Sequence, residues 1–114
     1  MSASENDELR AQLTKESKKL AKHNGFVLAY YAAQAIDDLK DLTLAQHFIE
    51  AAEAKIGTED QAHPCDLGKY IYKILKDRER AQAAYQKSLE ASGWDASSVK
   101  ATEKDWQKIV KTFK

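Results

Sequence analysis

The sequence predicts an all-α domain of about six helices, with two stacked helical hairpins between an N-terminal and a C-terminal capping helix. Three observations support this. The commonest residues, such as Ala, Lys, Glu, Gln and Leu, favour helices, whereas the chain has only 4 Gly and 1 Pro. Apolar residues recur at steps of three and four. Residues that start or end helices separate these segments. The 114 residues suffice for a single domain with its own core.

Several protein classes are excluded by composition. No stretch of about 18 apolar residues exists, so we expect no membrane span. The first residues, "MSASENDELR", are polar and acidic, unlike a signal peptide. The single cysteine, Cys65, has no partner for an internal disulfide, which fits a reducing compartment. We therefore expect a cytoplasmic protein.

Residues 1–25 predict an amphipathic N-terminal helix. Ser4 and Asp7 resemble a capping box at its start. The segment His23–Gly25, "HNG", predicts its end, through Asn or Gly in the left-handed conformation. Its narrow apolar stripe consists of Leu9, Leu13 and Leu20.

Residues 26–57 predict the first hairpin. Gly25–Leu39 is apolar almost all round. Its start also fits a strand, but its alanines and its length favour a helix buried on several sides. Asp41 is placed to cap the second helix, and Gly57 to end it.

Residues 58–94 predict a loop and the second hairpin, and residues 95–114 the capping helix. Pro64 suits the first turn of a helix that runs from about Cys65 to Leu75. Asp77 caps the next helix, and Gly93 ends it. In the last segment, Thr102 and Asp105 suggest a capping box. The apolar stripe that follows is Trp106, Ile109, Val110 and Phe113.

The two hairpins share a sequence pattern. "LKDLTLAQ" (39–46) and "LKDRERAQ" (75–82) match at five of eight positions, which a helix-rich sequence could also produce by chance. The second helices place Ala45 four residues before Ile49, and Ala81 four residues before Tyr85. This pattern resembles tetratricopeptide-like (TPR-like) helical hairpin repeats over residues 26–94. The repeat length here is 36 rather than 34 residues, and the closing proline of that family is missing.

The resemblance implies a non-enzymatic module that binds another protein, as an adaptor, inhibitor or regulator, through the first helix of each hairpin. Its binding residues would be Tyr30, Gln34, Asp37, Asp38, Asp66, Tyr70 and Lys73, flanked by Val27, His63 and Ile74. The alternative is that Tyr30 and Tyr70 are ordinary core residues.

Charge is distributed unevenly along the chain. Residues 1–60 hold 7 basic and 11 acidic side chains, and residues 61–114 hold 11 and 7. The two halves could therefore pair head to tail in a homodimer. The basic C-terminal half also suggests a nucleic-acid-associated regulator, against which the sequence pI near 6.8 argues. This half contains a cluster of Lys69, Lys73, Lys76, Arg78 and Arg80, followed by a basic stripe. This stripe consists of Lys100, Lys104, Lys108 and Lys111.

Candidate chemistry is confined to "HPC", where Cys65 lies near His63. At a helix start the pKa of Cys65 could be lowered, which would suit a thiol redox sensor, although a buried, inert thiol is the simpler interpretation. The scattered histidines, without CxxC or HExxH, predict no metal site. No phosphate-binding loop occurs. The adjacent carboxylates Asp37–Asp38 and Glu59–Asp60 do not form a shared acid/base pair, because neighbouring residues on a helix point about 100° apart. We therefore expect no catalytic residues and no cofactor.

Overall fold

The computed structural model describes residues 3–113, with side chains from residue 5 onward. This part of the chain contains six α-helices, one short 3-10 helix and no strand, which confirms the predicted all-α class. The elements are α1 (Ala3–Ser17), η1 (Leu20–Lys22), α2 (Gly25–Asp37), α3 (Leu42–Ala54), α4 (Pro64–Leu75), α5 (Arg78–Ala91) and α6 (Ala96–Val110).

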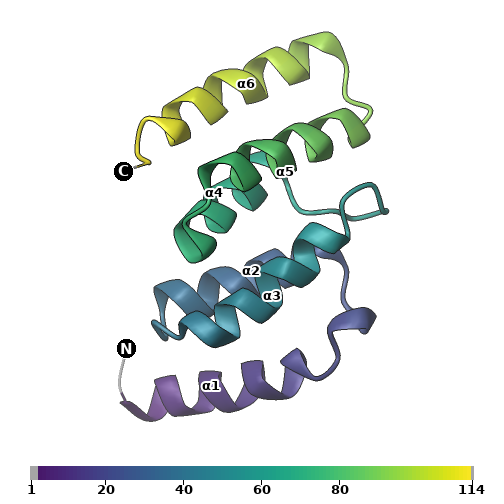
Figure 1. The fold of residues 1–114 in the computed structure, drawn as a ribbon. Coiled ribbons are helices and arrows are strands. Elements are labelled where there is room, and N and C mark those ends of the chain that lie inside the picture. Colours follow the sequence, from purple (N-terminus) through teal and green to yellow (C-terminus); the bar gives the residue numbers. More distant parts are fainter. Residues whose placement is uncertain (1–2, 114) are drawn as a thin grey trace.

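The helices form a stack with α1 at one end and α6 at the other (Figure 1). Helices α2 and α3 form the first hairpin, and α4 and α5 form the second. The hairpins meet where α4 packs against α3 and α2, while α1 contacts the first hairpin and α6 contacts α4. The radius of gyration is 14.3 Å, slightly more than the ~13 Å of a compact domain of this length. The molecule is therefore mildly elongated along the stack.

The turn inside each hairpin has the same backbone geometry. Lys40 and Lys76, thirty-six residues apart, have left-handed φ angles of 54° and 58°. Each is followed by a capping aspartate, as predicted. Asp41 Oδ1 accepts a hydrogen bond from the backbone of Leu44 at 3.1 Å, and Asp77 Oδ1 accepts one from Arg80 at 2.9 Å. The matching pattern in the sequence thus corresponds to a matching turn.

The packing inside the hairpins and the ends of their second helices also repeat. Ala45 and Ala81 are completely buried, which lets the two helices of each hairpin approach closely. Gly57 and Gly93 follow α3 and α5 with φ angles of 86° and 68°, a conformation that favours glycine.

One continuous core runs through the stack. It includes Leu13 of α1, Phe48 of α3, Leu67 of α4 and Trp106 of α6, each almost completely buried. The terminal helices therefore close the ends of a shared core.

The predicted end of the first helix is wrong. Helix α1 ends at Ser17, and neither Asn24 nor Gly25 is left-handed. Asn24 instead caps α2, because its Oδ1 accepts a hydrogen bond from the backbone of Val27 at 2.8 Å. Asparagine serves both as an N-cap and as a C-terminal stop, and here the following helix uses it. The predicted cap at Ser4 lies outside the described side chains.

The predicted capping box at Thr102 is also wrong. Helix α6 begins at Ala96, where Asp95 Oδ1 accepts a hydrogen bond from the backbone of Ser98 at 2.8 Å. Thr102 is buried within the helix and donates its hydroxyl to the Ser98 carbonyl at 2.8 Å. The helix lies within the predicted segment 95–114, but its polar first turns concealed the cap, because the apolar stripe becomes regular only from Trp106.

Candidate binding surface on α2 and α4

The predicted binding residues lie on the first helices of the two hairpins, which pack against each other. Helix α2 carries Tyr30, Gln34 and Asp37, and Asp38 is its C-terminal cap residue. The residues on α4 are Asp66, Tyr70 and Lys73. Ile74, which was also predicted to flank this surface, is only 2% exposed and belongs to the core.

Three of the predicted residues form one hydrogen-bonded cluster. Tyr70 Oη donates to Asp37 Oδ2 at 2.8 Å, and Lys73 Nζ forms an ion pair with the same carboxylate. Burial alone would raise the pKa of Asp37, but the hydrogen bonds from Lys73 and Tyr70 outweigh it and lower that pKa. Burial and the Asp37 carboxylate raise the pKa of Tyr70 to about 12, so its hydroxyl stays protonated. This cluster joins the two hairpins and satisfies its own charges.

Tyr30 and Asp66 lie apart from that cluster, in a small groove between α2 and the start of α4. We call it the aromatic groove; its volume is about 150 Å³. Phe26 and Tyr30 on its α2 side are 62% and 59% exposed. Its lining residues are Phe26, Ala29, Tyr30, Ala33, Ala62, His63 and Asp66.

The exposure of Phe26 differs from the prediction that this helix is buried on several sides. Helix α2 buries Leu28 and Ala32 in the core but leaves Phe26 and Tyr30, one turn apart, facing outward. The apolar composition of α2 concealed this exposed face, because nothing in the residue types separates it from the buried one.

A second groove continues from the first around His63. We call it the loop groove, because the segment between α3 and α4 forms one of its walls. Its volume is about 370 Å³. Trp94, which is 40% exposed, packs on the His63 ring with the centroids 5.4 Å apart. Glu59 and Asp60 also line this groove.

Cys65 does not have the environment expected of a redox sensor. The thiol is buried, and Sγ lies 3.6 Å from the Thr102 carbonyl oxygen. Burial, with the negative charges of Asp105 and Asp66, raises the pKa of Cys65 to about 11 instead of lowering it. His63 accepts a hydrogen bond from the backbone N–H of Cys65 at 3.1 Å through Nδ1, a contact with the amide and not with the thiol.

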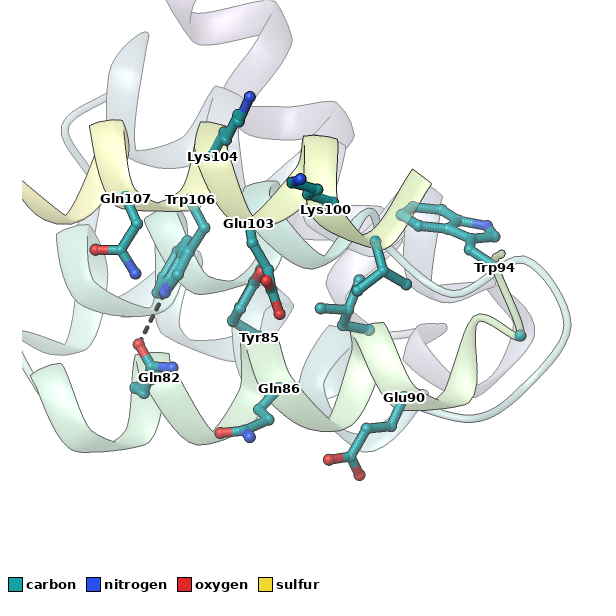
Figure 2. Close-up of a pocket in the computed structure, with 13 residues that line it drawn as sticks. Gln82, Tyr85, Gln86, Glu90, Trp94, Lys100, Glu103, Lys104, Trp106 and Gln107 are labelled. Atoms are coloured by element: carbon teal, nitrogen blue, oxygen red, sulfur yellow. Dashed lines mark hydrogen bonds between the residues drawn. The ribbon is translucent and has the colours of Figure 1, made fainter. Parts of the chain in front are cut away.

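A third groove of about 720 Å³ separates α5 from α6 (Figure 2). Its floor is the Trp106 ring, which stacks on Tyr85 with centroids 4.4 Å apart and donates Nε1–H to Gln82 at 2.8 Å. The sequence did not predict this α5–α6 groove. It arises because α6 packs on α4 beside Gly68, where a Cβ atom would lie 2.4 Å from the Trp106 ring.

Charges in the α5–α6 groove are balanced. Two lysines and two glutamates line it: Lys100, Lys104, Glu90 and Glu103. Lys100 and Lys104 belong to the predicted basic stripe, whose four members are all exposed. No described side chain forms an ion pair with any of the four.

Two further observations concern metals and membranes. Among the described residues, no group of three or more His, Cys, Asp or Glu side chains could hold a metal ion. None of the described helices has the length and apolar character needed to cross a membrane.

Comparison with known proteins identifies no family for this chain, so the evidence for repeated hairpins comes from the chain itself. It consists of the left-handed lysines, the capping aspartates and the terminal glycines, each pair thirty-six residues apart. No protein-family model, curated protein or solved structure matches the chain.

Proposed function

We propose that this chain is a non-enzymatic protein-binding module, built from two TPR-like helical hairpins and closed by a helix at each end. Its binding surface is the outer side of α2 together with the start of α4. The observation that carries the proposal is the exposure of Phe26 and Tyr30, one turn apart, on a helix whose other residues are buried or half-buried. Exposed aromatic side chains on a rigid scaffold are typical centres of protein interfaces.

The assignment within the predicted set follows from the contacts. Asp37, Tyr70 and Lys73 satisfy one another, so their main role is to hold the two hairpins together. Tyr30 and Asp66 border an open groove and are free to meet a partner. The binding centre therefore lies toward the start of α2 and α4, away from the hydrogen-bonded cluster.

Affinity capture from the native host tests this function. The double variant Phe26→Ser/Tyr30→Ser should not capture the proteins that the wild type captures, because it lacks the apolar side chains that a partner would bury. Its melting temperature should change little, since both side chains are exposed.

The matched control is Leu42→Ser, which removes a side chain that is 48% exposed and lines neither the aromatic nor the loop groove. It should capture the same proteins as the wild type. Equal capture by wild type and double variant would contradict the proposal.

A further inference from the structure

The exposed aromatic residues of this chain are concentrated around two connected grooves. Four large apolar side chains are well exposed among the described residues: Phe26, Tyr30, Leu42 and Trp94. All but Leu42 border the aromatic or the loop groove. Ala62 and His63 line both grooves, so the two grooves adjoin each other there.

This surface is also acidic. Glu59 and Asp60 border the loop groove, and Asp66 borders the aromatic groove. No described side chain forms an ion pair with these three carboxylates. Among residues 5–113, neither groove has a lysine or arginine in its lining. The surface therefore presents uncompensated negative charge, although the whole chain has a net charge of zero.

The basic residues that follow Asp66 along α4 interact with Tyr70 and Asp37. Lys69, three residues after Asp66, holds its Nζ 5.5 Å from the centre of the Tyr70 ring. Lys73 is paired with Asp37. These lysines mark a boundary between the acidic grooves and the cluster around Tyr70.

From this combination we infer that the two grooves bind a basic segment of a partner protein. An arginine or lysine of that segment lies between Phe26 and Tyr30 and directs its cation toward Asp66. Aromatic faces attract cations, and a guanidinium group also pairs with carboxylates. Glu59 and Asp60 attract further basic residues of the same segment along the loop groove, beside Trp94. This inference rests on the proposed function, because it specifies the partner of the same surface.

Other occupants fit this surface less well. Nucleic acid and other phosphate-bearing ligands are negatively charged, so the carboxylates of this surface repel them. An acidic peptide is repelled for the same reason. A second copy of this chain could supply basic residues from its α6 stripe, so self-association must be measured as well.

Selection from a library of short random peptides tests the inference. The wild type and the Phe26→Ser/Tyr30→Ser variant are used in parallel, and peptides retained by the wild type alone are sequenced. We expect these peptides to be enriched in arginine and lysine. Enrichment of neutral or acidic peptides would overturn the basic-ligand inference but would leave the proposed function standing. Retention of the same peptides by both proteins would overturn the proposed function itself.

Charge variants then test the carboxylates with a selected basic peptide. The triple variant Glu59→Gln/Asp60→Asn/Asp66→Asn should bind the peptide about tenfold more weakly, or weaker still. The reason is that removing one charge-assisted contact typically lowers the affinity about threefold to tenfold. Glu50→Gln is the control, because Glu50 is exposed on α3 and lines neither groove. Unchanged binding in the triple variant would contradict the inference.

The oligomeric state is measured on the same wild-type protein by sedimentation. We expect a monomer at the concentrations used for peptide binding. Self-association that Asp66→Asn or Lys104→Gln abolishes would instead assign the grooves to a second copy of the chain and overturn the inference.

Discussion

At the residue scale, burial and local partners decide how each polar side chain can act. Asp37 is held as a carboxylate by Tyr70 and Lys73, and its charge is therefore committed inside the fold. Asp66 stands only a few residues from Tyr70 along α4 but has no ion-pair partner among the described side chains. Two aspartates on neighbouring helices thus have different roles, one in joining the hairpins and one at an open groove.

Cys65 provides a prediction at this scale. Its pKa of about 11 lies well above the ordinary thiol value of 9.0, so the reactive thiolate near neutral pH should be about 100-fold scarcer than for a free cysteine. The folded protein should therefore be alkylated by iodoacetamide at least about 100-fold more slowly than the unfolded chain. The rate of modification, followed by mass spectrometry with and without urea, measures this difference. Rapid alkylation of the folded protein would support the redox-sensor hypothesis instead.

At the scale of the elements, the position of α6 depends on one missing side chain. Gly68 lies within α4 and leaves space for the buried Trp106 ring, which Tyr85 and Gln82 hold in place. Because the ring sits between the helices, α6 contacts α4 but leaves an open groove beside α5. A single glycine thereby sets the shape of one end of the stack.

The variant Gly68→Ala tests this role. In an ordinary helix interior this change stabilises a protein by about 0.5–1 kcal/mol. Here the new Cβ would lie 2.4 Å from a buried ring that cannot move freely, so we expect destabilisation by about 1–3 kcal/mol. Urea unfolding measures the change in the free energy of unfolding.

The double variant Gly68→Ala/Trp106→Leu separates the clash from other effects. If the ring causes the destabilisation, adding Gly68→Ala to the Trp106→Leu variant should change the free energy of unfolding only slightly. The effects of the two substitutions on stability will then not be additive. A stabilising Gly68→Ala in the wild-type background would show that α6 adapts without strain.

The hairpins were predictable from the sequence because their signals are local. An aspartate before a helix and a glycine after it act within a few residues of the chain, and Asp41, Asp77, Gly57 and Gly93 behave as expected. The cap of α6 was misplaced at Thr102 because the first turns of the helix are polar, although Asp95 is the same kind of cap. Local signals identified the helices, but they did not locate the cap of a helix whose first turns have no apolar pattern.

The candidate site was only partly predictable, because its properties depend on contacts between distant residues. The choice of α2 and α4 as the relevant helices came from the resemblance to repeated hairpins. The sequence could not show that Tyr70 bonds to Asp37, thirty-three residues away. Nor could it distinguish the exposed Phe26 from the buried Leu28, since both are apolar members of one helix.

At the scale of the whole molecule, opposite charges are separated along the stack. The aromatic groove lies where α2 meets the start of α4, in the middle of the stack, and the loop groove reaches Trp94 just before α6. The exposed lysine stripe lies along α6 at one end of the stack (Figure 1). Because the net charge is zero, no overall positive charge attracts a polyanion to the chain.

This distribution leads to a prediction about nucleic acid. At physiological salt we expect no retardation of a generic DNA duplex, because a few lysines on one helix are opposed by negative charge elsewhere. Gel retardation over a series of salt concentrations measures this. Retardation at physiological salt that disappears when Lys100, Lys104, Lys108 and Lys111 are changed to Gln would favour the nucleic-acid alternative.

The placement of the two tryptophans gives the protein a pair of native fluorescent reporters. Trp106 is buried in the core, whereas Trp94 is partly exposed at the point where the loop groove and the α5–α6 groove both begin. A ligand in the loop groove would change the emission of Trp94 alone, and a ligand in the α5–α6 groove would reach both indole rings. Unlabelled protein can therefore report which of these grooves a ligand occupies.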